Sequence, residues 1–163
     1  MINIRNDMKL TKKLLHDFLK KHKLMFIATQ GNHPWIAAVY YTFDNDLNLY
    51  FLSSPETLHV KQIEKNPEVA VAISDSNQKL TDLKKGLQIY GKVKQISDLN
   101  KIKHAVNLWK KSLGYKGSEI SYENMINKVI KGRMFKITPK KIKFFNQELF
   151  DVEDCREPIL TLS

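Results

Sequence analysis

Residues 24–53 read LMFIATQGNHPWIAAVYYTFDNDLNLYFLS, and the predicted architecture follows from this segment. It holds three apolar runs of strand length, at 24–29, 34–43 and 47–53, which are separated by Gln30-Gly31-Asn32 and Asp44-Asn45-Asp46. Runs rich in aromatic and β-branched residues, bounded by Gly, Asn and Asp, are typical of strands joined by tight turns. Because these connections are too short for a crossover helix, the segment predicts an antiparallel meander.

The rest of the chain adds strands and helices around this meander. Helices are predicted at 8–23, 54–65, 98–113 and 121–131, and strands at 69–73, 87–96, 133–138 and 141–145, the last two broken by Pro139. In the second helix, Ser54 suits the N-cap and Pro55 the first turn. Gly91 lies inside the strand at 87–96, where a glycine marks a bulge or a close approach of two backbones.

The order of these elements predicts the fold class. We expect a mainly β protein with peripheral helices, in which six or seven antiparallel strands form a small barrel rather than a doubly wound parallel sheet. The 163 residues suffice for one domain with a substantial core. We assign residues 1–146 to that domain, with its N-terminal helix at about 8–23, and leave residues 147–163 as a C-terminal tail without predicted structure.

Composition narrows the class of protein further. Cys155 is the only cysteine, so the chain forms neither an intramolecular disulfide nor a cysteine zinc cluster. The sequence has no apolar run near the ~18 residues of a spanning helix and no secretory signal pattern, so we expect a cytoplasmic protein without a membrane partner. The formal net charge of +10 fits either a polyanion partner or a lysine-rich solvated surface. Because the lysines are spread singly or in pairs, we favour the solvated surface over nucleic-acid binding.

One candidate site lies in residues 53–67, SSPETLHVKQIEKNP. Ser53, Thr57, His59 and Lys61 fall at the junction of a strand and a helix. Free backbone N–H groups at a helix start, joined by hydroxyls and cations, suit a phosphate. The structural alternative is that these residues only cap the helix.

A second candidate site is the strand at 34–43. Its small residues Ala37, Ala38 and Val39 stand beside the large, flat side chain of Tyr40. Small side chains allow a planar ligand to approach the backbone, whose N–H and C=O groups then contact polar ring edges. The alternative is that the apolar residues of this strand belong to the core.

The order of the motifs resembles one known family. The matching stretches are GNHPWIAAV (31–39), LYFLS (49–53), GLQIYGKV (86–93) and RMFKITPKKIKF (133–144), together with the Thr57-Leu58-His59 segment. Over about residues 10–146 they resemble the pyridoxamine 5′-phosphate oxidase-like FMN-binding split-barrel family, and most of all a poorly characterised bacterial branch of it.

The resemblance implies a homodimer with two FMN molecules at the subunit interface. It implies that Ser53 and Thr57 hold the FMN phosphate, and that Leu58 and His59 replace an arginine and a lysine of the family's cluster. From its position one helical step further on, we infer that Lys61 supplies the missing charge. It places the isoalloxazine ring along Ala37, Ala38, Val39 and Tyr40, mainly through backbone contacts. Gln88 would reach the ring from the partner subunit. Ala37 stands where the oxidase has an arginine, which argues against oxidation of pyridoxamine phosphate.

The resulting hypothesis is a flavin-dependent oxidoreductase that acts on a small molecule. The hydride or electron chemistry would belong to the FMN. The sequence indicates neither a catalytic acid or base nor a set of metal ligands. Two alternatives remain open: a non-enzymatic binder of flavin or haem, and a basic nucleic-acid-binding protein, which only the net charge supports.

Overall fold

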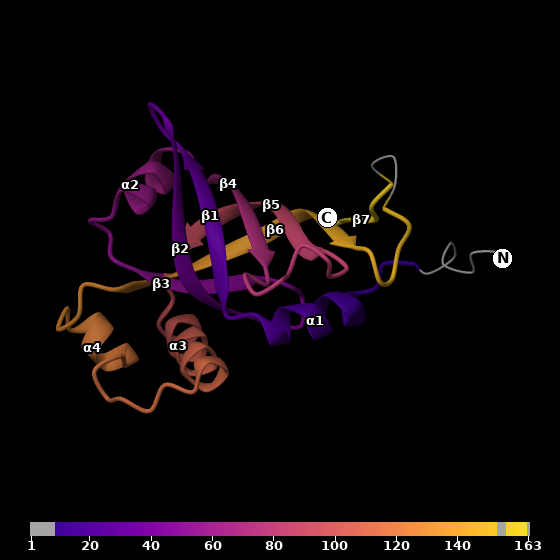
Figure 1. Ribbon diagram of the computed structural model, residues 1–163. Coiled ribbons are helices and arrows are strands. Elements are labelled where there is room, and N and C mark those ends of the chain that lie inside the picture. Colours follow the sequence, from indigo (N-terminus) through magenta and orange to yellow (C-terminus); the bar gives the residue numbers. More distant parts are fainter. Residues whose placement is uncertain (1–8, 153–155, 163) are drawn as a thin grey trace, which may run out of the picture.

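The computed structural model describes residues 9–152 and 156–162, which form seven strands and four helices (Figure 1). In chain order these are α1 (Lys12–Lys21), β1 (Leu24–Gln30), β2 (Pro34–Phe43), β3 (Leu49–Ser53), α2 (Leu58–Lys65), β4 (Glu68–Ser74), β5 (Lys85–Gln95), α3 (Leu99–Leu113), α4 (Tyr122–Ile126), β6 (Arg133–Asn146) and β7 (Ile159–Thr161).

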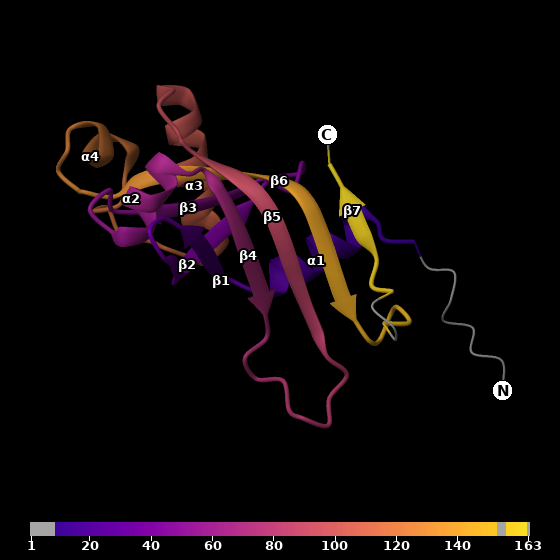
Figure 2. The same ribbon diagram turned by 90° about the horizontal axis from the view of Figure 1, so that it is seen from above.

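The strands form one antiparallel sheet that closes on itself. Their order is β3-β2-β1-β4-β5-β6-β7, and β3 also pairs with β6, so the first six strands make a closed barrel. β7 adds to the far edge of β6 outside the barrel (Figure 2). This arrangement confirms the predicted barrel of six or seven antiparallel strands.

The β1–β2 hairpin begins the barrel. β2 has the bounds that its turn chemistry predicts, and the β1–β2 register runs from Leu24 opposite Tyr40 to Gln30 opposite Pro34. At the hairpin tip, a Cβ on Gly31 would lie 2.9 Å from Cγ of Gln62 on α2. Glycine therefore allows α2 to pack closely against this tip.

The start of α2 corrects the predicted helix. Residues 54–57 form a turn in which Thr57 N donates to the Ser54 carbonyl at 3.2 Å, and the helix begins at Leu58. Thr57, not Ser54, is the N-cap residue; its hydroxyl donates to the Ser54 carbonyl and accepts no helical N–H. A Ser-Pro-Glu sequence suits a turn as well as a first helical turn.

β6 corrects the two predicted C-terminal strands. It runs unbroken through Pro139, because the pairing register with β5 shifts there: Tyr90 lies opposite Lys141, and Gly91 opposite Pro139. A proline is tolerated at a bulge, where the ladder is already interrupted. A Cβ on Gly91 would lie 2.7 Å from the Thr138 carbonyl oxygen, so the close backbone approach predicted at this glycine is confirmed.

Two apolar clusters stabilise the barrel. The larger fills its interior and takes in α1, with the rings of Phe51 and Phe135 stacked at 5.2 Å between centroids. The smaller lies outside the barrel wall, where Trp109 of α3 and Met125 of α4 pack with Tyr50 and other buried residues. α3 therefore covers the outer side of the wall near β3, which Figure 1 also shows.

Phe150 and β7, which follow β6, belong to the same structure. Phe150 is only 6% exposed and packs in the barrel core, and β7 pairs with residues 141–143 of β6. Cys155 lies outside the described residues. In the part of the chain that the structure describes, none of the helices is long and apolar enough to cross a membrane.

Candidate functional site

A compact polar cluster lies where β3 ends and α2 begins. Ser53 Oγ lies 2.8 Å from His59 Nε2, and Thr57 Oγ1 lies 3.3 Å from each of these two atoms. His59 is only 8% exposed, and its burial lowers the pKa of the imidazole below its ordinary value of 6.5. The neutral ring can then accept a hydrogen bond at Nε2.

The protons of this cluster can be assigned by following its donors. The Thr57 hydroxyl donates to the Ser54 carbonyl at 2.8 Å, so the lone pairs of Thr57 Oγ1 are left for other donors. With the imidazole proton on Nδ1, the Ser53 hydroxyl donates to His59 Nε2. In this tautomer both hydroxyl protons are used within the protein, whereas an imidazole proton on Nε2 would be donated to Ser53 Oγ and leave the Ser53 hydroxyl to a phosphate.

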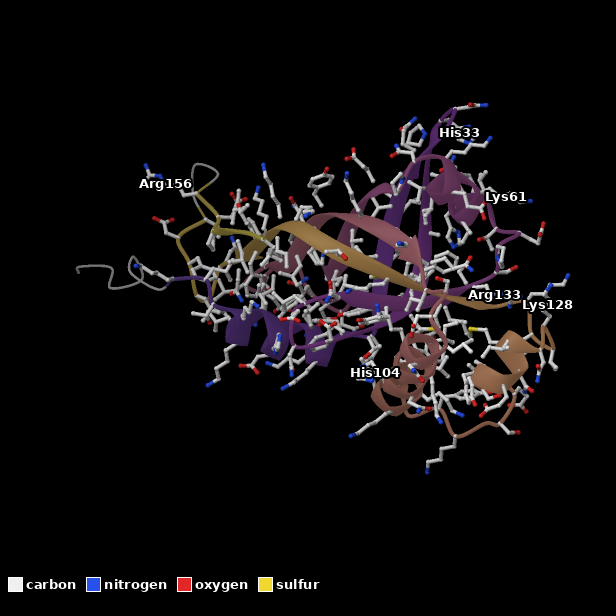
Figure 3. All side chains as sticks on the ribbon, turned by 180° about the vertical axis from the view of Figure 1, so that it is seen from behind. His33, Lys61, His104, Lys128, Arg133 and Arg156 are labelled. Carbon is white, nitrogen blue, oxygen red and sulfur yellow. The ribbon has the colours of Figure 1, made fainter. Side chains whose placement is uncertain are left out.

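Lys61 of α2 and Arg133 of β6, the strand paired with β3, are two cations that are held differently. Lys61 Nζ lies 3.2 Å from Glu56 Oε2 in an exposed ion pair. Arg133 is paired directly with Ser53 across the β3–β6 ladder, and its Nη1 donates to the Ile130 and Gly132 carbonyls at 3.0 and 2.8 Å. Figure 3 shows Lys61 and Arg133 at the same end of the molecule.

Gln62 fixes the position of α2. Its side chain is buried and joins the β1–β2 hairpin twice, because Thr29 Oγ1 donates to Gln62 Oε1 at 2.5 Å and Gln62 Nε2 donates to the His33 carbonyl at 3.1 Å. The sequence analysis did not predict this anchor. Gly31, whose missing side chain leaves room for Gln62, is the one residue of the hairpin tip that hints at it. The anchor holds the Ser53–Thr57–His59 cluster beside β2.

β2 has an open backbone edge. It pairs with β1 from Pro34 to Tyr40, but its ladder with β3 covers only residues 41–43. Tyr41 N donates to the Lys23 carbonyl, so alternate residues from Tyr41 backwards face β1. The N–H and C=O groups of Ile36 and Ala38 therefore point to the other side, where no strand of the described chain pairs with them.

The predicted residues of β2 divide between two orientations. Ala37 and Val39 turn their backbone groups to β1 and pack their side chains against the barrel core. Ala38 and Tyr40 turn their side chains outward, and Tyr40 is 59% exposed. The Tyr40 carbonyl accepts a hydrogen bond from Trp109 Nε1 at 3.3 Å. This bond places α3 at the Tyr40 end of the open edge, next to the ladder between β2 and β3.

Gln88 lies on another part of the sheet. The register aligns Ala38, Phe26, Ala72 and Gln88 in one row across β2, β1, β4 and β5. Three strand spacings separate the two ends of this row, or about 14 Å. The structure thus brings Ser53, Thr57 and His59 together, leaves Lys61 bound to Glu56, and separates Gln88 from Ala38 by three strand spacings within one chain.

Two cavities lie elsewhere on the protein. One of about 750 Å³ is formed by α1, the loop between β4 and β5, and the end of β6, and a second of about 610 Å³ lies between α3 and the strands β5 and β6. None of the nine predicted site residues lines either cavity. The described residues also hold no group of three or more His, Cys, Asp or Glu arranged to bind a metal ion.

The closed six-stranded barrel, with β2 parted from β3 beside a polar cluster, defines a split-barrel protein. The sequence profile of the family described as pyridoxamine 5′-phosphate oxidase matches residues 11–146, most of the chain. The chain belongs to this family, which confirms the resemblance found in the sequence.

Relatives by sequence match a shorter region. A UPF0306 protein of Pasteurella multocida is 35% identical over 86 residues, which are 52% of this chain and 57% of that protein. A UPF0306 protein of Yersinia pestis is 30% identical over 86 residues, covering 52% of this chain and 58% of that protein. The matched region is therefore little more than half the length of these relatives.

Solved structures share the fold at low sequence identity. The conserved hypothetical protein Rv2991 from Mycobacterium tuberculosis superposes with a TM-score of 0.68 and 16% identity, covering 86% of this chain and 88% of that one. A FAD-binding protein from Mesorhizobium loti superposes with a TM-score of 0.62 and 16% identity, covering 82% and 90%. At these identities the likeness extends to the fold alone.

Proposed function

We propose that this protein binds FMN at the split between β2 and β3 and works as a flavin-dependent oxidoreductase on a small molecule. One observation carries the proposal: the unpaired backbone of β2 and the hydroxyl cluster lie on the two sides of the same opening. The ladder between β2 and β3 ends at the pair Tyr41–Phe51. Ala38 lies three residues before Tyr41, and Ser53 two residues after Phe51.

The residues on the β2 side fit the flavin ring. The free N–H and C=O groups of Ile36 and Ala38 are hydrogen-bonding groups that need a partner when they are covered. The methyl group of Ala38 allows a flat ring to approach them. These features support a planar ligand whose edge carries both donors and acceptors, as the isoalloxazine does.

The residues on the α2 side suit a phosphate, but they would hold it less strongly than the arginine and lysine that the family resemblance implies. Ser53 and Thr57 supply two hydroxyls, and Arg133 and Lys61 supply positive charge nearby. Lys61 must first exchange Glu56 for the phosphate, an exposed pair that contributes little to stability. Buried, neutral His59 adds no fixed charge, so its part is to hold the Ser53 hydroxyl.

The chemistry divides between cofactor and protein. When bound, FMN supplies the hydride or electron transfer. The chain's own residues would bind and orient the ring along β2, hold the phosphate at the start of α2 and exclude water from one face. Ala37 places a methyl group where the oxidases of this family carry an arginine, so we do not expect pyridoxamine phosphate as the substrate.

A second copy of this chain would complete the site. The outer face of β1, β2, β4 and β5 exposes large apolar side chains, with Ile36 62% and Tyr40 59% exposed, beside small alanines. An exposed apolar face of this kind is typical of an interface. Because three strand spacings separate Gln88 from Ala38 in one chain, a homodimer is the arrangement in which Gln88 would contact the ring.

Reduction of the bound flavin separates an enzyme from a non-enzymatic binder. The purified protein is loaded with FMN, freed of excess cofactor and mixed with NADH or NADPH under anaerobic conditions. An oxidoreductase that uses a nicotinamide donor bleaches the yellow colour much faster than the same amount of free FMN. A rate equal to that of free FMN with both donors would favour the flavin carrier.

A further inference from the structure

The cavity between α3 and the barrel wall is lined by several lysines that have no role in the proposed flavin site. Its volume is about 610 Å³, within the range of small-molecule sites. It is lined by Tyr50, Lys94, Gln95, Ile96, Ser97, Asp98, Asn100, Lys101, His104, Lys136 and Thr138. Neither Ser53 nor any residue of the open β2 edge is among them, so this is a separate cavity.

Two of its lysines face each other. Lys94 of β5 is the direct cross-strand partner of Lys136 of β6, and both alternate with buried residues and so point away from the barrel core. Like charges directly opposite each other destabilise a sheet. Lys101 adds a third ammonium group from the first turn of α3. An anion between these groups would remove the repulsion.

In the part of the chain that the structure describes, these lysines form no ion pair. Other lysines on the same strands have acidic partners: Lys85 with Glu148 at 2.6 Å and Lys143 with Glu157 at 3.1 Å. Among the described residues, no carboxylate lies within ion-pair distance of Lys94, Lys101 or Lys136. The one acid in the lining is Asp98, whose Oδ1 caps α3 by accepting from Lys101 N at 2.9 Å.

We propose that this cavity binds a small molecule through a diphosphate group, or through two neighbouring phosphates. Three lysines in the lining of one cavity, two of them direct cross-strand partners, match an anion of multiple charge. The lining also offers neutral side chains, Gln95, Ser97 and Asn100, for hydrogen bonds to the rest of the ligand, and the ring of Tyr50 and the side chain of Ile96 as apolar surface.

A small ligand fits these observations better than a nucleic acid. The three lysines line one cavity, whereas a nucleic-acid backbone is typically bound by a basic patch or stripe that extends along an exposed surface. The cavity is also bounded on two sides, by the strands and by α3. The proposal does not depend on flavin binding, since the two sites share no lining residue.

Calorimetric titration with inorganic pyrophosphate at physiological salt tests the site. We expect saturable binding of one pyrophosphate per chain to the wild type. The double variant Lys94→Gln/Lys136→Gln should bind at least ~10-fold more weakly, because it loses two charge-assisted contacts. The matched control Lys92→Gln/Lys141→Gln removes the same charge from the same strands outside the cavity and should keep the wild-type affinity.

Three results would overturn the proposal: no saturable binding of pyrophosphate at millimolar concentration, equal weakening in both double variants, or stronger binding of a single-stranded oligonucleotide that competes with pyrophosphate. The single variant Lys101→Gln guards against misfolding, because its side chain lies on an exposed helical turn. It should weaken binding while thermal unfolding stays at the wild-type temperature. Thr57→Ala/Lys61→Ala should leave pyrophosphate binding unchanged, which separates this site from the proposed flavin site.

Discussion

The Ser53 hydroxyl oxygen lies 2.8 Å from Nε2 of His59, and this contact closes the turn between β3 and α2. The imidazole occupies a position where the family resemblance implies a lysine. Because the ring is buried and its pKa is lowered, the neutral imidazole shares a hydrogen bond with the Ser53 hydroxyl instead of adding a positive charge. The polar cluster is therefore built around a hydroxyl whose direction the histidine sets.

The double variant Thr57→Ala/Lys61→Ala tests the phosphate side of the flavin site. It removes one hydroxyl and one cation from the start of α2, and we expect the dissociation constant for FMN to rise at least ~10-fold. Fluorescence quenching of added FMN measures the change. Lys65→Ala, at the last turn of the same helix, should leave the affinity unchanged. If the double variant kept stoichiometric FMN, the assignment of the phosphate to Ser53 and Thr57 would be wrong.

Burial of His59 predicts a loss of stability in mild acid. The unfolded imidazole titrates near 6.5, whereas the folded one titrates lower, so the unfolded chain takes up a proton first as the pH falls. The free energy of unfolding should therefore be constant well above pH 6.5 and should decrease from about there down through the folded pKa.

Urea unfolding at several pH values measures this effect. His59→Gln should show a smaller decrease between pH 7.5 and 5.5 than the wild type. Burial also lowers the pKa of His22, so His22→Gln serves as a second variant that removes a separate part of the slope. An unchanged slope in His59→Gln would mean that the imidazole is already protonated or exposed.

The close approach of β5 and β6 at the bulge predicts an asymmetry between two glycines of one strand. Gly91→Ala places a methyl group 2.7 Å from the Thr138 carbonyl oxygen and should destabilise the fold by about 1–3 kcal/mol. Gly86→Ala meets its nearest atom, the Ile73 carbonyl oxygen, at an ordinary 3.5 Å and should stay within about 0.5 kcal/mol. Chemical denaturation of both variants gives the comparison, and equal effects would contradict the bulge geometry.

The exposed outer face of the sheet predicts that a charge there prevents dimerisation. Phe26→Glu, in the middle of the row that joins Ala38 to Gln88, should shift the mass by light scattering from about twice the chain to that of the 19.0 kDa monomer. Leu80→Glu, at a side chain that is 93% exposed in the loop before β5, should leave the mass unchanged. A wild-type monomer that still binds FMN would contradict the interface.

Local signals in the sequence were sufficient for the barrel strands. Turn residues at both ends set the bounds of β2, and the lone interior glycine marked the bulge. Local signals were insufficient where tertiary contacts decide between two local structures. Residues 54–57 fit both a helix start and a turn, and the Thr57–Ser54 hydrogen bond selects the turn. Pro139 suggested a break, but it falls at the register shift opposite Gly91, where the ladder is already interrupted.

The candidate site divides in the same way. Ser53, Thr57 and His59 lie within seven residues, so their proximity follows from the sequence alone. The pairing of Arg133 with Ser53 and the contact of Gln62 with Thr29 join segments that lie far apart in the chain. The Lys94–Lys136 pair likewise depends on the β5–β6 register, which the bulge shifts. Sequence patterns do not carry this information.

Titration of the purified protein with FMN, followed by visible absorption, tests the central claim most directly. The account predicts that the flavin bands shift and sharpen on binding and that the change saturates near one FMN per chain. The stoichiometry separates this site from weak association with a basic surface, which would not saturate at a fixed ratio. A protein that stays colourless after removal of free FMN and leaves its spectrum unchanged would contradict the account, and a Soret band in the purified protein would point to haem in its place.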